Sequence, residues 1–588
     1  MTAQKEIILK GIGVSPGVAV GPAHVLSTAE VQYIERPVDE DEIPREMTRF
    51  EDAIMATRAQ LRELQEKVEQ GLDRGKASIF DAHLLVCDDR SFIEDVLRGI
   101  RTRRLNVEPV LAGVSERYAA ALARVEDEYL RERAADIRDV TRRIQMNLAG
   151  RNPSSLGALT EPSIILAADL SPSETAGMDR QKVLAFATDH GSTTSHTAIM
   201  ARALELPAVV GLHDASIQLT QGERVLVDGT AGLVIIHPTN ERIDGYTRIR
   251  RARAEVMDRL NGLRDEPART RDGYEIELAA NIELPHDVDS VLQHGAQGVG
   301  LFRTEFLFLR RTTLPSEEEQ LRAYEEVARR LAPSPVVIRT LDIGGDKFSS
   351  ALNMPREINP FLGCRAIRFS LNQPELFRAQ LRAILRASVL GNVKLMYPMI
   401  SHADELDQAT RILDQVRMSL SREGVPFDEE MEVGCMIEVP SAALTARSLA
   451  QKVRFFSIGS NDLIQYTMAV DRVNENIAYL YEPTHPAILR LIRETISAAR
   501  DEGIWTGICG EMAGHPLFTP LLLGLGVDEL SVSPVRTPII KGMVRSLKYA
   551  DCEALAREAL ASDSGAQVLE LCEKLTSATA SDIVSLTR

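Results

Sequence analysis

In the second half of the chain, short apolar runs alternate regularly with longer amphipathic stretches. Short continuous apolar runs are typical of strands buried on both faces, and the amphipathic stretches between them are typical of helices. Eight such runs over about 300 residues favour a closed parallel (β/α)8 barrel over an open doubly wound sheet. The predicted strands are Ile276–Ala280, Gly298–Phe302, Val336–Ile338, Val393–Tyr397, Val433–Ile437, Phe455–Ile458, Thr506–Ile508 and Glu529–Val532.

The first half of the chain changes character twice. Apolar and small residues broken by Gly and Pro predict short strands over residues 7–22. Helical spacing then runs from residue 40 to residue 148, with amphipathic stretches over Phe50–Glu69 and Ser115–Leu148. Strand-like runs return at Ser163–Ala167, Val183–Ala187, Ala208–Val210, Arg224–Val227 and Leu233–Ile236. A helical bundle therefore interrupts one small α/β domain.

A polar, Arg-rich stretch with little apolar face follows this domain. Such a pattern suits a solvent-exposed helical connector, and an ordinary surface helix fits it equally well. We predict a multidomain α/β chain in five segments. These are the first part of the small α/β domain (1–30), the inserted bundle (31–147), the second part of the α/β domain (148–237), the linker (238–268) and the barrel (269–588).

Composition narrows the classes of function. A length of 588 residues with 44% hydrophobic and 26% charged residues is ordinary for a multidomain globular protein. No apolar run is long enough to cross a membrane, and the N-terminus lacks the pattern of a signal peptide. Six scattered cysteines without a Cys-x-x-Cys pair argue against a disulfide framework or a zinc site and favour the cytoplasm. A net charge of −17 disfavours nucleic acid and anionic lipid and favours a basic protein partner.

One histidine lies where a helix is predicted to begin. His196 follows a run of small hydroxyl residues, of which Thr194 or Ser195 would cap the helix that Pro207 ends. Free backbone N–H groups and the positive end of the helix dipole favour a phosphate at such a place. We therefore predict a nucleophilic imidazole at His196.

Polar residues gather just after the predicted barrel strands, where the active sites of such barrels lie. Two arginines suit phosphate and carboxylate oxygens, and two carboxylates from neighbouring strands suit Mg²⁺. This combination predicts a pocket for a small phosphorylated acid. The residues are Arg303 with Glu305, Arg339 with Asp342, Glu438, Asn461 with Asp462, and Cys509.

Several long strings resemble Enzyme I of the bacterial sugar phosphotransferase system. Thr194–Arg202 resembles the phosphohistidine motif of that family. The strings that resemble its phosphoenolpyruvate barrel are Gly300–Phe308, Arg339–Lys347, Asn359–Arg368, Ile458–Leu463 and Gly507–Glu511. The resemblance runs in family order from about residue 8 to residue 550 and leaves the last 40 or so residues without a signal.

The resemblance implies a fold and a reaction. The fold is a small phosphohistidine swivelling domain with an inserted helical bundle, followed by a C-terminal (β/α)8 TIM barrel. His196 would take the phosphoryl group of phosphoenolpyruvate, leaving pyruvate, and pass it to a histidine of the phosphocarrier protein HPr. Such a protein would be a cytoplasmic homodimer joined through the barrel.

The resemblance also implies roles for individual residues. Arg303, Arg339, Arg365 and Arg472 would hold phosphate and carboxylate, with Asn461 on the phosphate. Mg²⁺ would bind Glu438 and Asp462, and Cys509 would protonate the enolate carbon. The inserted bundle, including His83, would bind HPr.

Three other classes of protein fit parts of this pattern, and the chain differs from the family at a few positions. A dikinase-like pyruvate or phosphoenolpyruvate enzyme, a non-catalytic regulatory homologue and a lone barrel aldolase or lyase share parts of the pattern. The chain has Ser192 and Thr193 where the family usually has glycine and often a basic residue, and Cys364 where an aromatic residue is common. Ser460 replaces a usual threonine, a change that we expect to matter little.

Overall fold

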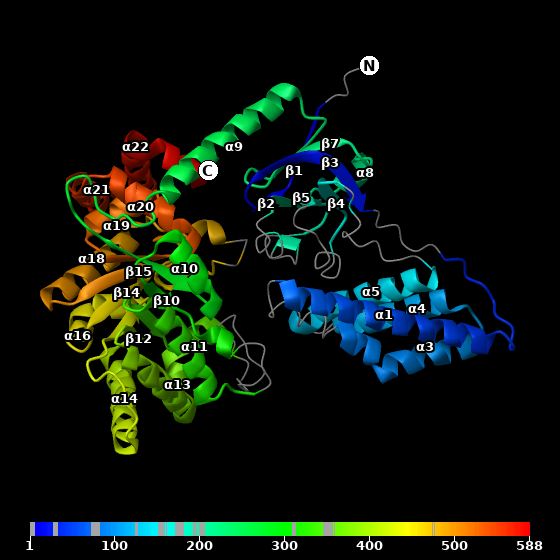
Figure 1. Cartoon of the computed structure of the whole chain (residues 1–588), viewed down its shortest axis with the longest axis horizontal. Helices are drawn as coiled ribbons and strands as arrows, with labels where there is room; N and C mark the ends of the chain where they lie inside the picture. The colour runs from blue at the N-terminus through cyan, green and yellow to red at the C-terminus, as the bar shows by residue number, and fades with distance from the viewer. Residues whose placement is uncertain are drawn as a thin grey trace. The chain divides into compact units, whose positions relative to one another are not determined.

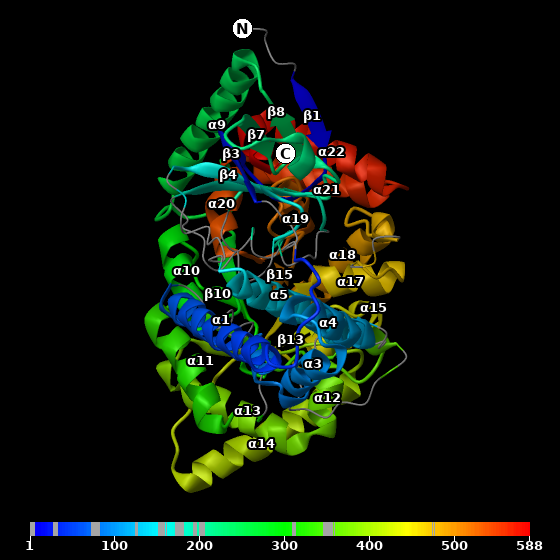
Figure 2. The same cartoon turned by 90° about the vertical axis from the view of Figure 1, so that its right-hand side faces the viewer.

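The structure is a computed structural model of the chain (Figures 1 and 2). Its residues form two compact units, residues 1–250 and 251–588. The described residues are all those outside 1–5, 27–32, 72–82, 124–127, 151–158, 160, 171–181, 192–196, 199–200, 202–205, 309–312, 345–356, 358, 473, 475–476 and 588.

The first unit contains an eight-stranded mixed sheet in the order β1-β8-β7-β3-β4-β5-β6-β2. Its centre, from β3 to β6, is parallel, and the outer strands pair antiparallel. Apolar clusters cover the sheet, and its central strands are therefore buried along their length. The strands are β1 Ile7–Lys10, β2 Ile12–Ser15, β3 Val18–Leu26, β4 Ser163–Ala167, β5 Val183–Thr188, β6 Ala208–Val210, β7 Arg224–Asp228 and β8 Leu233–Ile236.

Helices with their own apolar core separate β3 from β4 along the chain. Since β3 and β4 pair side by side, the helices form an insertion between neighbouring strands, as the sequence predicts. Phe50, Phe92 and Ile144 lie at the centre of the insertion's core. Its long helices are α1 Ile43–Gly71, α3 Arg90–Arg103, α4 Val107–Ala123 and α5 Glu128–Leu148, and the short α8 Ala215–Gln218 follows β6 in the sheet region.

The predicted connector is the helix α9, Asn240–Asn261. Near its start, Arg242 forms an ion pair with Glu6 at 2.8 Å. Near its end, Arg259 pairs with Asp582 of the C-terminal helix. The helix is therefore anchored by side chains of the first unit at its beginning and by side chains of the second unit at its end.

The second unit is a closed barrel of eight parallel strands with helices around its outside (Figure 1). This confirms the predicted fold class, and each predicted strand lies within two residues of an observed one. The strands are β9 Glu277–Ile282, β10 Val299–Phe302, β11 Val336–Arg339, β12 Val393–Tyr397, β13 Val433–Ile437, β14 Phe455–Gly459, β15 Trp505–Cys509 and β16 Glu529–Val532. The helices are α10 Val288–His294, α11 Glu317–Leu331, α12 Ala366–Asn372, α13 Pro374–Ala387, α14 Ala403–Glu423, α15 Pro440–Leu444, α16 Ala446–Ala450, α17 Ser460–Met468, α18 Pro486–Asp501, α19 Thr519–Leu525, α20 Thr537–Ser546, α21 Tyr549–Ala561 and α22 Gly565–Val584.

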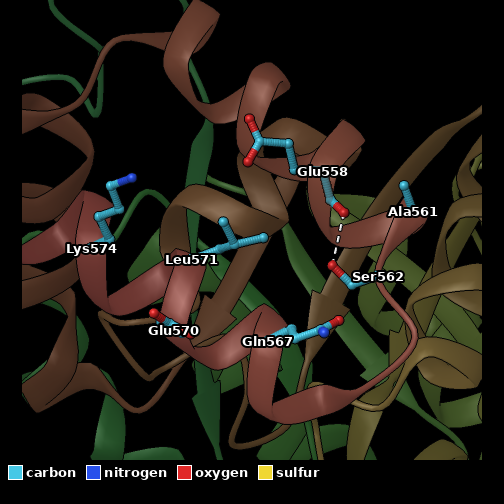
Figure 3. Close-up of a pocket in the computed structure, with 7 residues that line it drawn as sticks. All are labelled: Glu558, Ala561, Ser562, Gln567, Glu570, Leu571 and Lys574. Carbon is cyan, nitrogen blue, oxygen red and sulfur yellow. Dashed lines mark hydrogen bonds between the residues drawn. The ribbon is translucent and has the colours of Figure 1, made fainter.

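The last 40 residues, which carry no motif, complete the barrel's outer layer. Cys552 of α21 and both Val568 and Cys572 of α22 are fully buried in the main core. Between α21 and α22 lies an open cavity of about 440 Å³ lined by polar side chains together with Ala561 and Leu571 (Figure 3). None of the predicted site residues lines this cavity. Within the described residues, no helix has the length and apolar character that crossing a bilayer requires.

A buried carboxyl group lies in the barrel at the start of β16. Glu529 is only 4% exposed, and glycines make room for it, since a Cβ at Gly300 would lie 2.4 Å from its Oε1 atom. Burial, and then the nearby Glu277, raise the pKa of Glu529 to about 8, against an opposing effect of Lys394. The group is therefore neutral in the folded barrel near pH 7.

We expect Glu529→Gln to change the pH dependence of stability. In the unfolded chain this carboxyl ionises near its ordinary pKa of 4.5, but in the barrel only near pH 8. Folding therefore loses stability as pH rises from about 4.5 to about 8. The variant should unfold like the parent near pH 5 and be more stable by about 4 kcal/mol above pH 8.5, measured by calorimetry. Glu570→Gln, at an exposed position of α22, is the control, and an equal difference at both pH values would contradict the prediction.

Candidate functional site

The predicted site residues of the second unit collect at the carboxyl ends of the barrel strands. All but Arg365 and Arg472 come from the end of a strand or from the first turn after it, so the closed barrel brings their positions to one rim. Arg339 ends β11, Cys509 ends β15, Arg303 follows β10, Glu438 follows β13, and Asn461 with Asp462 begin α17 after β14. Arg365 comes from a different position, immediately before α12.

Two buried arginines and three carboxylates form a continuous network of ion pairs at this rim. Arg339 contacts Glu305 at 2.6 Å and Asp342 at 3.0 Å. Arg365 contacts the other oxygen of Asp342 at 3.0 Å and Asp462 at 3.6 Å. The side chains of Arg339 and Arg365 are 6% and 5% exposed, so the network is shielded from water.

Both arginines keep an unused donor. Among the described residues, the buried Nε atoms of Arg339 and Arg365 have no hydrogen-bond partner. Burial alone would lower the pKa of Arg339, but Glu305 and Asp342 raise it, so the guanidinium stays charged. A buried donor on a permanent cation is satisfied by an anionic oxygen, and phosphate or carboxylate supplies one.

Glu438 is a fully buried carboxyl group beside this network. One oxygen accepts a 2.7 Å hydrogen bond from the backbone N–H of Met399. The other faces a glycine, since a Cβ at Gly459 would lie 2.6 Å from Oε2. Burial, then Asp462 and Asp342, raise the pKa of Glu438 to about 8, whereas Arg339 and Arg365 lower it.

This donor set fits a divalent cation. When Glu438 is ionised, the network holds four carboxylates against the two arginines, so the site carries excess negative charge. Glu438 Oε2 and Asp462 supply the hard oxygen donors that Mg²⁺ prefers. The described residues include no group of three or more His, Cys, Asp and Glu side chains placed to hold a metal, so a cation here would take further oxygens from water or substrate.

Asn461 is oriented by its neighbours. Its Oδ1 accepts hydrogen bonds from the backbone N–H of Glu511 at 3.0 Å and from the Tyr481 hydroxyl at 3.4 Å. Among the described residues no hydrogen bond uses its amide NH₂ group, which can therefore donate to a ligand. Sequence reasoning missed Tyr481, and the bonding of Asn461 to Glu511 depends on a backbone turn that no sequence pattern indicates.

The turn that binds Asn461 also carries Cys509. Gly510 has a φ of +99°, and a Cβ there would lie 2.4 Å from the Ser460 Oγ atom. The Ser460 hydroxyl, which is fully buried, donates a 2.9 Å hydrogen bond to the carbonyl oxygen of Cys509. Burial raises the pKa of the Cys509 thiol to about 11, so the sulfur carries its proton at neutral pH.

Two further arginines lie at the margin of the network. Arg303 is one-third exposed and pairs with Glu283. Arg472 is exposed and forms a hydrogen bond to Tyr481, the residue that contacts Asn461. The margin of the buried network thus carries one partly exposed and one exposed arginine, each with a protein partner of its own.

The predicted nucleophile, His196, lies outside the described residues. The residue after it, Thr197, is helical and buried, and its hydroxyl donates to the Leu170 carbonyl oxygen at 3.4 Å. Gly191, before it, has a φ of +124°. Thr197, the residue after His196, therefore contacts the loop that follows β4.

His83 lies inside the helical insertion. Its side chain is 0% exposed, and its Nε2 atom is 3.2 Å from Asp136 and 3.9 Å from Asp139, both on α5. A ring in this position holds two segments of the bundle together. Leu85, two residues later, is 60% exposed.

Three family models for PEP-utilising enzymes match the chain in succession. The N-terminal model matches residues 10–133, and the mobile-domain model matches residues 159–232. The model of the PEP-binding domain matches residues 257–549, which contain the whole ion-pair network.

Relatives are similar over almost the full length. The phosphoenolpyruvate-protein phosphotransferase of Listeria innocua is 44% identical over 568 residues, 97% of this chain and 99% of the relative. The protein of the same name from Geobacillus stearothermophilus is 46% identical over 553 residues, 94% of this chain and 95% of the relative. A solution structure of Enzyme I is 40% identical, with a TM-score of 0.37, and covers 41% of this chain and 97% of that one.

We expect Gly510→Ala to destabilise the barrel more than a comparable change in open space. The new Cβ combines an unfavourable φ with a contact at 2.4 Å to Ser460 Oγ and 2.9 Å to Asn461 Oδ1. Together these should lower the free energy of unfolding by about 3 kcal/mol. Gly391→Ala is the matched control, because Gly391 has a φ of +77° with nothing within 4 Å, and should cost only about 1 kcal/mol. Equal losses in urea denaturation would mean that the turn is not tightly packed.

Proposed function

The chain belongs to the phosphoenolpyruvate-protein phosphotransferase family, and on that premise we propose how its residues carry out the reaction. It is an enzyme of the sugar phosphotransferase system that uses phosphoenolpyruvate. The phosphoryl group passes from phosphoenolpyruvate to His196, pyruvate leaves, and a histidine of HPr then receives the phosphoryl group. The observation that carries this proposal is the buried network at the barrel rim, with two arginines whose Nε donors have no partner in the described part of the chain.

Substrate binding uses this network. Arg339 and Arg365 are held by Glu305, Asp342 and Asp462, so their charges are fixed in place before the substrate arrives. Preorganised cations need little rearrangement as charge develops during the reaction. Arg303, Arg472 and the NH₂ group of Asn461 complete the set of donors for phosphate and carboxylate.

Glu438 and Asp462 would hold Mg²⁺. The cation neutralises charge on the phosphoryl and enolate oxygens when bound. The raised pKa of Glu438 reflects burial and carboxylate crowding, which a divalent cation relieves.

An imidazole nitrogen of His196 forms a bond to phosphorus while the bridging P–O bond breaks, and the electron pair stays on the enolate oxygen. The carbon–carbon double bond of the enolate then takes a proton from the Cys509 thiol, which gives the methyl group and the keto group of pyruvate. Cys509 suits this role because it is protonated at neutral pH and buried at the end of β15.

The helical insertion would bind HPr. His83 is buried, so we assign it a supporting role, in which it fixes the segment of Leu85 against Asp136. The exposed Leu85 would then offer an apolar contact for the carrier.

We further propose that the protein is cytoplasmic and forms a homodimer through its barrel. Its segments are 1–30, 31–147, 148–237, 238–268 and 269–588. A chain that serves both a donor site in the barrel and an acceptor on another protein needs a mobile histidine domain.

Labelled phosphoenolpyruvate tests the reaction. With Mg²⁺ and no ATP, the protein should acquire acid-labile label, and His196→Ala should abolish it without changing the thermal unfolding of the barrel. His190→Ala, an exposed histidine six residues earlier, should keep the label. Labelling that requires ATP would indicate a dikinase, and label-free protein under both conditions would indicate a regulatory homologue.

A surface substitution tests the carrier site. Leu85→Glu should slow phosphoryl transfer to HPr by more than tenfold, because it places a charge in an apolar contact, while self-phosphorylation stays unchanged. Met418→Glu on α14 is the matched control, since Met418 is 58% exposed and Leu85 is 60% exposed. Unchanged transfer by Leu85→Glu in rapid-quench measurements would remove Leu85 from the carrier site.

A further inference from the structure

The Cys509 thiol lies in a small apolar compartment inside the barrel. It is 3% exposed and clusters with apolar side chains of five other barrel strands, which are Leu301, Val337, Met396, Met436 and Phe455. Such surroundings disfavour a thiolate, because they supply no donors for its charge. A thiol that must give up a proton here needs a donor close to its sulfur.

One hydroxyl group meets that need. Ser457 lies on β14, the strand beside β15, and its hydroxyl donates to the Cys509 sulfur at 3.6 Å. Ser457 is 2% exposed, and within the described part of the chain its side chain forms no other hydrogen bond. The thiol itself donates to the Ile458 carbonyl oxygen at 3.6 Å.

The strand register keeps this contact in place. Ser457 pairs with Gly507 and Gly459 pairs with Cys509, so the serine is two residues before the partner of the cysteine. The Ser460 hydroxyl donates a hydrogen bond to the carbonyl oxygen of Cys509 at 2.9 Å. The sulfur is thus fixed between a donor hydroxyl and an acceptor carbonyl.

We propose that Ser457 is a positioning residue for proton delivery, whose hydroxyl stabilises the Cys509 thiolate by a hydrogen bond after the proton has left. This inference rests on the proposed role of Cys509 as the acid. The S–H bond breaks, a C–H bond forms at the enolate carbon, and the former S–H electron pair remains on sulfur. Water reprotonates the thiolate before the next turnover.

The charges around the sulfur support this role. Burial raises the pKa of Cys509, the Ser457 hydrogen bond lowers it, Glu438 raises it, and Arg339 and Arg303 lower it. The two arginines act through space from β11 and the end of β10, whereas Ser457 touches the sulfur. Removing the hydroxyl therefore makes the thiol a weaker acid.

Ser457→Ala in the full-length protein tests the proposal. We expect the single-turnover rate of pyruvate formation, followed by coupling to lactate dehydrogenase, to fall about tenfold. The phosphoenolpyruvate concentration at half-maximal rate should change less than about twofold, because the substrate donors are untouched. Alkylation of Cys509 by iodoacetamide, followed by mass spectrometry between pH 7.5 and 9.5, should be about tenfold slower at each pH, because a smaller fraction of the thiol is ionised when its pKa is raised.

Two variants separate a local role from a packing effect. Ser457→Thr keeps the hydroxyl and should restore the rate to within about threefold of the parent. Ser531→Ala removes another fully buried barrel hydroxyl, which bonds Asn281 at 2.7 Å, and should leave pyruvate formation within about twofold. Unchanged rate and alkylation in Ser457→Ala would overturn the proposal, as would an equal loss in Ser531→Ala.

Cys509→Ala distinguishes failure of this inference from failure of the proposed function. If Cys509 is the acid and Ser457 acts through it, Ser457→Ala combined with Cys509→Ala should be no slower than Cys509→Ala alone. A normal rate in Cys509→Ala would overturn the acid role itself, whatever the alkylation data show. A slow Cys509→Ala with normal alkylation in Ser457→Ala would overturn the role of Ser457 alone.

Discussion

The buried ion pairs among Arg339, Glu305, Asp342 and Arg365 are the constraint on which the barrel rim depends. Each charge has lost its water, so each is tolerated only because its partners remain. Removing any one of them would leave an uncompensated charge, which typically costs about 3–5 kcal/mol. The network is therefore held as a unit, and its geometry is rigid before any ligand arrives.

Burial in the same low-polarity interior changes the pKa values of Glu438 and Cys509, the two groups beside the network. It raises the pKa of Glu438, so that the carboxylates there favour a cation. It also raises the pKa of Cys509 and keeps the thiol protonated. Burial thus favours a cation at Glu438 and keeps Cys509 protonated as an acid. The neighbours of each group decide which of these two roles that group takes.

The barrel strands were predictable because each is buried on both faces and reads as one apolar run, as in Val393–Tyr397 and Glu529–Val532. Predicting the strands also predicts which residues lie at the strand ends, and this identifies Arg339 and Glu438 as candidate site residues. Arg365 depends on a short turn before α12, and only family resemblance singled it out.

Other contacts were not indicated by an apolar run or by a position at a strand end. Ser457 is a polar residue within the apolar strand β14, and that mismatch is the one clue the sequence offers. The burial of His83 and the packing of α21 and α22 against the barrel depend on tertiary contacts between distant segments, which periodicity does not encode. The roles of His196, the carrier site and the dimer remain predictions.

The turn from Cys509 to Glu511 has a consequence for how such an enzyme can evolve. One backbone segment both carries the acid and orients Asn461, and Gly510 leaves no room for a side chain between them. A substitution that changes how this turn orients Asn461 therefore also moves Cys509. During evolution, the position of the amide that contacts the substrate and the position of the thiol that donates the proton have to change together.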